Sequence, residues 1–147
     1  EKFARAILPL PEEAFIQMGD LVGFALEQCA AKGIPDVTIV AMIGKMSKMA
    51  AGVFQTHASH SRVDTNFLAE LASICGLPPE MVGMARESTT ARHFYEILPE
   101  EVAGRVFSRL CEVASGRCRE HTLGRLGVEC ILVAFGGQVL GRAQAHA

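Results

Sequence analysis

The sequence predicts an α/β fold in which a small three-stranded sheet, one strand plus a C-terminal β-hairpin, packs with about six helices. Apolar residues recur at intervals of three and four over most of the chain, which is the helical period. A β-branched run at residues 37–43 follows a Gly-Ile-Pro-Asp turn and indicates a strand buried on both faces. Two apolar runs, residues 128–135 and 139–142, flank Gly136-Gly137 and indicate the hairpin.

Proline, glycine and capping residues bound the predicted helices. The first helix begins near residue 12 and ends before Gly33, and the second begins near Lys45. Gly19 and Gly23 lie inside the first helix, where each costs about 1 kcal/mol relative to alanine. We therefore expect close packing against another backbone at both glycines. The other predicted helices span residues 62–75, 79–85, 90–98 and 99–121.

Length and composition indicate one folded domain, residues 1–147, with 50% hydrophobic and 20% charged residues. Lys plus Arg is 14 against 16 for Asp plus Glu, which argues against a dedicated nucleic-acid binder. A few local cations would still suffice for an anionic small molecule. No apolar stretch approaches the roughly 20 residues of a membrane helix. Because the chain has neither an initiator Met nor a signal-peptide pattern, we interpret it as a piece of a longer cytoplasmic protein.

The five cysteines are odd in number, and no two form a CxxC motif. Cys29, Cys75 and Cys111 fall on the apolar faces of predicted helices. We therefore expect buried free thiols in a reducing compartment. A cysteine metal site is not expected because the usual paired spacing is missing.

The first candidate site is the junction at Gly44, where a predicted strand ends and a helix begins with Lys45 in its first turn. Free backbone N–H groups and the helix dipole favour an anion there, and Lys45 and Lys48 add positive charge. The segment has too few glycines for a Walker A loop or a dinucleotide-binding motif. The alternative is an ordinary strand–helix turn with solvated lysines.

The second candidate is a polar loop with Thr56, His57 and Arg62, followed by Asp64. Loops on rigid scaffolds often carry function, and His57 suits anion recognition or acid–base chemistry. We predict no protein metal site, because His57 and His60 have no evident third ligand. The alternative is a solvated loop in which Ser61 caps the next helix, and Asp64 could also be a cap rather than a ligand.

The third candidate comprises Thr90, Arg92 and His93 at a predicted helix start. A hydroxyl followed by cationic side chains suits the binding of carboxylates. The alternative is helix capping by Ser88 or Thr89 with exposed charges beside it.

These three segments occur together and in this order in one family. The matching stretches are residues 10–20 (LPEEAFIQMGD), 43–52 (IGKMSKMAAG), 55–57 (QTH), 90–93 (TARH) and 128–133 (VECILV). On these residues the sequence resembles the cobalt-precorrin-5B C1-methyltransferases of anaerobic cobalamin biosynthesis, the CbiD family, over essentially the whole chain. Family members are longer and have a Gly-rich N-terminal portion. The resemblance therefore implies that this chain is a C-terminal domain.

The sequence departs from the family pattern at three places. Gln55 and Thr89 each stand where the family often has asparagine, and both are mild polar changes. Ala134-Phe135 replaces an acidic residue that is usual near the final hairpin turn. This third change falls in a predicted structural turn, so it bears only on the geometry of the turn.

The resemblance implies methyl transfer from S-adenosyl-L-methionine, a co-substrate, to ring carbon C1 of a cobalt-bound tetrapyrrole, giving cobalt-precorrin-6A. Cobalt then belongs to the substrate. Positioning should dominate such an in-line displacement, and His57 is the candidate catalytic residue that would assist a proton or orient a carboxylate. Because the substrate carries many acetate and propionate groups, we expect local cations to bind it. These are Lys45, Lys48, Arg62 and Arg92, with the Gly44 helix start.

Alternatives to a catalytic substrate-binding domain stay open. The chain could be a non-catalytic tetrapyrrole-binding module, or a scaffold or dimerisation unit whose chemistry lies in the missing N-terminal domain. The S-adenosylmethionine pocket could lie in either half or at their boundary. The expected partners are the anionic cobalt-tetrapyrrole, the missing domain and a second copy of the chain, whereas nucleic acid and membrane are not expected.

Overall fold

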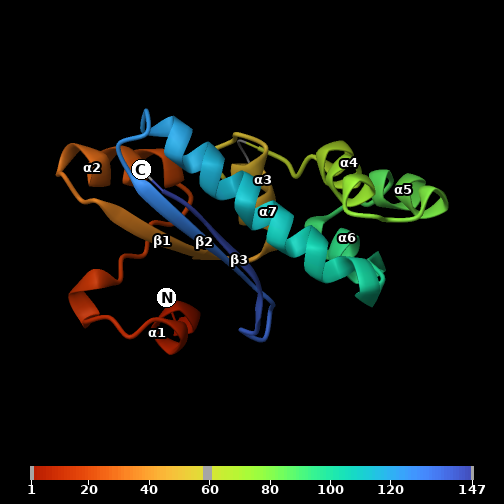
Figure 1. Ribbon diagram of the computed structural model, residues 1–147, viewed down its shortest axis with the longest axis horizontal. Helices are drawn as coiled ribbons and strands as arrows, with labels where there is room; N and C mark the ends of the chain where they lie inside the picture. The colour runs from red at the N-terminus through yellow and green to blue at the C-terminus, as the bar shows by residue number, and fades with distance from the viewer. Residues whose placement is uncertain (1, 58–60, 147) are drawn as a thin grey trace.

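The computed structural model describes residues 2–57 and 61–146 and has one three-stranded sheet covered by helices (Figure 1). Strands β1 (Asp36–Ala41), β2 (Gly127–Val133) and β3 (Val139–Ala145) lie in the order β1-β2-β3. β1 pairs with β2 in parallel, and β2 pairs with β3 in an antiparallel hairpin. The predicted fold class is therefore confirmed.

Long helix α7 (Glu100–His121) packs on β2 and β3, and α3 (Ile43–Ala50) lies against α7. Figure 1 shows α4 and α5 grouped beyond the end of the sheet, near the N-terminal half of α7. The first helix, α1, was not predicted. The remaining described helices are α1 (Lys2–Ile7), the short 3-10 helix η1 (Glu12–Ala14), α2 (Val22–Ala31), α4 (Thr65–Ile74), α5 (Pro79–Arg86) and α6 (Ala91–Ile97).

The central strand is β2, not β1. All residues of β2 except Glu129 are buried, because the strand is apolar along its length and is covered on both faces. β1 is an edge strand in which Ile39 and Ala41 are buried while Asp36 and Thr38 are exposed. The prediction of a doubly buried strand over residues 37–43 is therefore wrong in burial, and wrong by two residues at its end.

The first predicted helix is also wrong over residues 15–21. Gly19 has φ +59°, a left-handed conformation that favours glycine and ends helical geometry. Leu21 instead forms an antiparallel bridge with Gln55, so α2 begins only at Val22. This pairing depends on contacts between residues more than 30 positions apart, which helical periodicity does not report.

Gly23 does lie at a close packing contact, but with side chains rather than with the predicted backbone, whereas Gly19 does not. A Cβ atom on Gly23 would lie 3.1 Å from Phe54 Cβ and 3.1 Å from His121 Nε2. A Cβ on Gly19 would meet no atom within 4 Å. Gly19 is therefore explained by its φ angle, and Gly23 by the approach of its neighbours.

The C-terminal half agrees closely with the prediction, with α5 and α7 each within one residue of the expected ends. α4 begins three residues later than predicted because Asp64 caps it. Within the described residues, no helix has both the length and the apolar content needed to cross a bilayer.

Candidate functional site

Two lysines on α3 join segments that are far apart in the sequence. The Lys48 Nζ atom donates a hydrogen bond to the Thr56 carbonyl oxygen at 2.8 Å. The Lys45 Nζ atom donates to the Gly19 carbonyl oxygen at 2.5 Å. Residues three apart on a helix are neighbours on its surface. The two lysines therefore hold the segment before α2 and the segment after α3 beside the same helix.

A left-handed turn returns the chain to Lys48. Gly52 has φ +84°, and the Val53 N–H donates to the Lys48 carbonyl oxygen at 2.8 Å. A glycine in this conformation commonly ends a helix and reverses the chain direction. This turn places Thr56 beside Lys48, only eight residues later.

Thr56 connects the two segments further. Its hydroxyl donates to Asp20 Oδ1 at 3.1 Å, and its backbone N–H donates to the Asp20 carbonyl oxygen at 3.1 Å. The exposed fractions are 9% for Lys48 and 5% for Thr56, so the contacts are shielded from water. We call the linked residues Asp20, Lys48 and Thr56 the α3 network. The sequence predicted Lys48 and Thr56 but missed Asp20, whose signal was its place at the end of the matching stretch 10–20.

Gly44 lies in the first turn of α3, which begins at Ile43 rather than near Lys45. The N-cap residue Met42 makes no side-chain hydrogen bond to the N–H groups of this turn. A Cβ on Gly44 would meet no atom within 4 Å, so the glycine is not required by packing. Anion binding at this turn stays a prediction.

The polar loop after Thr56 is exposed at His57 and Arg62. Ser61 lies beside the start of this loop, because its Oγ donates a hydrogen bond to the Gln55 carbonyl oxygen at 2.9 Å. Asp64 is the N-cap of α4 and accepts a hydrogen bond from the Phe67 N–H at 3.0 Å, so the predicted cap Ser61 is wrong. His60, considered with His57 as a metal ligand, lies outside the described residues.

The third segment opens α6. Thr90 is the N-cap, and its Oγ1 accepts from the His93 N–H at 3.0 Å, so the cap is Thr90 rather than Ser88 or Thr89. Arg92 Nε donates to Glu96 Oε1 at 3.1 Å. Among the described residues, no hydrogen bond or ion pair connects this segment with the α3 network. Hydrogen bonds thus join the first two predicted segments, whereas the third is linked to them through the packing of α6 on α3.

Arg92 has a second partner in the final hairpin turn. Its guanidinium carbon lies 4.5 Å from the centroid of the Phe135 ring, which is a cation–π contact. Phe135 also approaches Tyr95 edge-on, with the ring centroids 6.5 Å apart. The position where the family usually has an acidic residue is therefore adjacent to a predicted substrate-binding arginine.

The cysteines are free thiols, and Cys111, Cys118 and Cys130 are buried. Burial raises the pKa of Cys111 to about 11. A hydrogen bond with Cys118, together with burial, raises the pKa of Cys130 above its ordinary value. Residues 2–57 and 61–146 contain no group of three or more His, Cys, Asp or Glu side chains placed to hold a metal ion.

A family model described as the C-terminal domain of CbiD matches residues 55–144. The chain belongs to the CbiD family. The match includes Thr56, His57, Arg62 and the α6 segment, and it leaves the two lysines of α3 outside.

Curated relatives extend the similarity of this CbiD chain over nearly all of its length. A protein of Geobacillus sp. (strain WCH70) named cobalt-precorrin-5B C(1)-methyltransferase is 43% identical over 97% of the chain. Proteins with the same name from Leptospira interrogans and Priestia megaterium are 37% identical over 98% and 99% of it. The chain spans about 40% of the length of each of these relatives. No solved structure matches the chain.

Proposed function

We propose that this CbiD chain is the C-terminal part of a methyltransferase that uses S-adenosylmethionine to methylate C1 of cobalt-precorrin-5B. The observation that carries the proposal is the 43% identity over 97% of the chain to a relative of that name. The local geometry supports a substrate-binding part, because α3 places one accessible lysine beside a rigid polar network. We also propose that the protein acts in the cytoplasm, where its five cysteines stay reduced.

Lys45 is the first cation that we assign to a substrate carboxylate. An ammonium group has three N–H donors, and Lys45 uses one of them on the Gly19 carbonyl oxygen. Two donors remain for an anion. Lys45 is only half-buried, so an anion can reach its side chain. The Gly44 turn beside it offers backbone N–H groups to the same anion.

Lys48 has a different role in this proposal. Its ammonium is buried and donates to the Thr56 carbonyl oxygen, so Lys48 positions the segment that leads to His57. We therefore assign Lys48 and Thr56 to positioning rather than to contact with the macrocycle. His57 is the candidate group for orienting a carboxylate or moving a proton, because it follows the rigid network directly and is exposed.

Arg62 and Arg92 are the proposed outer cations. Both are exposed, and the ion pair between Arg92 and Glu96 joins two largely exposed side chains. Such surface pairs contribute little free energy, so a carboxylate of the substrate can replace Glu96. The guanidinium keeps its position over the Phe135 ring during that exchange.

The residues around α3 do not by themselves fit a whole S-adenosylmethionine molecule. Two cavities among the described residues, of about 440 Å³ and 180 Å³, are lined by none of the predicted site residues. We therefore propose that the remainder of the full-length protein completes the pocket for the methyl donor. In this proposal the chain binds and orients the anionic macrocycle.

The test uses the full-length protein and compares Lys45→Ala with Lys32→Ala, a lysine just after α2 that lies outside the site. We expect Lys45→Ala to weaken substrate binding at least tenfold and Lys32→Ala to leave it unchanged. Unchanged binding in Lys45→Ala, Arg62→Ala and Arg92→Ala would overturn the assignment of the cations. If the wild-type protein fails to methylate cobalt-precorrin-5B, the proposed activity itself is wrong.

A further inference from the structure

The last residue of α7, His121, packs against the segment that leads into the α3 network. The centroid of its ring lies 4.4 Å from that of the Phe54 ring, and the two planes are tilted by 38°. Phe54 stands two residues before Thr56 and three before His57. A side chain from the end of α7 therefore contacts the start of the segment that carries the candidate catalytic residue.

A hydrogen bond from α2 holds the ring of His121 in place. Its Nε2 atom lies 3.1 Å from Glu27 Oε1. The His121 side chain is 26% exposed and that of Glu27 is 54% exposed, so this pair contributes little free energy by itself. Its effect is geometric, because a hydrogen bond to one ring nitrogen fixes the orientation of an imidazole.

Gly23 provides the space in which these two rings meet. A Cβ on Gly23 would lie 3.1 Å from His121 Nε2 and 3.1 Å from Phe54 Cβ. The Gly23 N–H also donates a hydrogen bond to the Phe54 carbonyl oxygen at 3.2 Å. A glycine is unfavourable within a helix such as α2, and its lack of a side chain lets His121 and Phe54 approach the helix backbone.

The other end of the same segment is held by α3. Lys48 Nζ donates to the Thr56 carbonyl oxygen at 2.8 Å, and the Thr56 N–H donates to the Asp20 carbonyl oxygen at 3.1 Å. Residues 54–56 are therefore fixed at Phe54 by α7 and α2, and at Thr56 by α3. His57 follows directly, so the position of its backbone depends on both ends.

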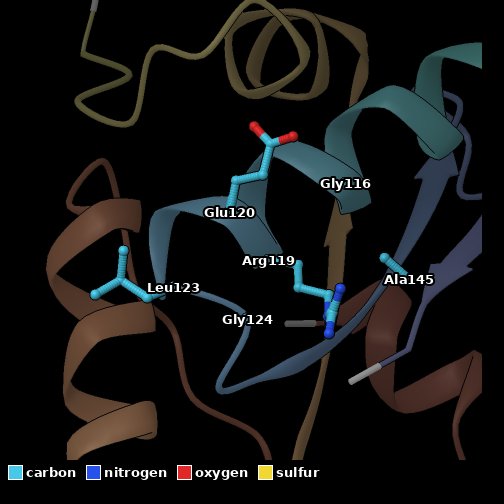
Figure 2. Close-up of a pocket in the computed structure, with 6 residues that line it drawn as sticks. All are labelled: Gly116, Arg119, Glu120, Leu123, Gly124 and Ala145. Carbon is cyan, nitrogen blue, oxygen red and sulfur yellow. The ribbon is translucent and has the colours of Figure 1, made fainter.

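The contact of His121 is separate from the hollow at the same end of α7, which Figure 2 shows. The α7 residues that line this hollow, Gly116, Arg119 and Glu120, recur at intervals of three and one, with Leu123 three positions further on. They occupy one face of the helix. His121 is not among them, so its ring lies in a packed junction with Phe54 rather than in an open space.

We propose that His121 is a positioning residue that holds His57 in place through the ring of Phe54. This inference rests on the proposed function, in which His57 orients a carboxylate or moves a proton. His121 itself does not touch the substrate. Its role matters for turnover because a displacement of about 1 Å in a reacting group can lower a rate by about 100-fold.

Four variants of the full-length protein separate the ring of His121 from its hydrogen bond. His121→Phe keeps a ring against Phe54, whereas His121→Gln keeps a donor for Glu27 and removes the ring. Gly23→Ala places a methyl group 3.1 Å from both rings' residues and disturbs the same contact from α2. Gly116→Ala on α7 is the matched control, because a Cβ there meets no atom within 4 Å. Circular dichroism checks that each variant is folded.

The first readout is the NMR signal of the His57 ring in protein labelled with ¹³C at the Cε1 atoms of histidine. His57→Asn identifies this signal by removing it. We expect His121→Gln and Gly23→Ala to shift the signal, and His121→Phe and Gly116→Ala to leave it at its wild-type position. A residue that only stabilised the fold would not move the signal in a folded variant.

The second readout is methyl transfer. We expect kcat to fall at least fivefold in His121→Gln and Gly23→Ala, with KM within twofold of the wild type because the proposed substrate-binding cations are unchanged. His121→Phe should restore at least half of the wild-type kcat. Failure of this rescue in a folded protein would contradict a role for the ring.

The two readouts distinguish this inference from the proposed function. A wild-type protein without methyltransferase activity would overturn the proposed function, while the His57 signal would still test the positioning. An unshifted His57 signal in folded His121→Gln would overturn the positioning role whatever the activity. If His121→Gln does not fold, Gly23→Ala decides in the same way.

Discussion

The ammonium group of Lys48 lies 2.8 Å from the carbonyl oxygen of Thr56, and both residues are buried. The contact closes a turn of eight residues that begins in α3 and passes through Gly52. Because Thr56 also binds Asp20, the same contact fixes the segment before α2. The conformation of the candidate site therefore depends on one buried cation that does not itself need to meet the substrate.

Replacing Lys48 with methionine tests this dependence. Lys48→Met keeps the length of the side chain but leaves the buried Thr56 carbonyl oxygen without its donor. We expect the free energy of unfolding to fall by about 1–3 kcal/mol. Urea denaturation measures the change, and Lys32→Met, an exposed lysine, should stay within about 0.5 kcal/mol of the wild type. Equal stability of the two variants would show that the contact is not structural.

Gly141 of β3 lies directly against the backbone of α7. A Cβ there would lie 2.9 Å from the Phe107 carbonyl carbon and 3.0 Å from the Ser108 nitrogen, both backbone atoms that cannot move alone. We therefore expect Gly141→Ala to cost about 1–3 kcal/mol of stability.

Gly104 supplies the matched control for that substitution. It lies in α7, and a Cβ on it would meet no atom within 4 Å. Gly104→Ala should stabilise the protein by up to about 1 kcal/mol, because alanine favours a helix over glycine. Thermal denaturation of both variants measures the opposite shifts in Tm. A Gly141→Ala variant as stable as Gly104→Ala would contradict the close packing of β3 on α7.

The sequence predicted those elements whose signal is local. The α7 helix, the hairpin around Gly136-Gly137 and the α5 start at Pro79 all follow from capping, turn and periodicity rules within a few residues. The long-range bridge between Leu21 and Gln55 was not predictable in this way, because it interrupts an apolar helical pattern.

In the candidate site, too, the residues with a short-range sequence pattern were predicted, whereas those that depend on long-range contacts were missed. Capping at the starts of α4 and α6 was foreseen because capping residues have a short-range sequence pattern, although the cap of α6 is Thr90 rather than Ser88 or Thr89. Asp20 was missed, since nothing near it in the sequence indicates its contact with Thr56, 36 positions away.

Two substitutions at Asp64, the N-cap of α4, distinguish the effect of its charge from the effect of its hydrogen bond. Asp64→Ala should lower the free energy of unfolding by about 1 kcal/mol, because the Phe67 N–H loses its acceptor. Asp64→Asn keeps an oxygen acceptor and should leave stability nearly unchanged. Substrate binding by the full-length Asp64→Asn protein then reports the carboxylate alone. We expect no loss, and a tenfold loss would instead assign the carboxylate to binding.

Burial of Cys111 predicts how stability depends on pH above neutrality. Its pKa is raised from an ordinary value of 9.0 to about 11, so the folded state keeps its proton where the unfolded state releases one. The stability contribution is fully present below pH 9 and is lost as the pH rises from 9 to about 11. A shift of about two pKa units corresponds to about 3 kcal/mol.

Cys111→Ser and Cys111→Ala are not suitable probes of this effect, because both also change the packing of α7. We instead expect urea denaturation of the wild-type chain to give constant stability between pH 7 and 8.5 and a decline between pH 9 and 11. Iodoacetamide labelling provides the independent readout. At pH 8 the folded protein should label first at the half-buried Cys29 and Cys75, while Cys111 reacts only on unfolding. Rapid labelling of Cys111 in the folded state would contradict its burial between α7 and the sheet.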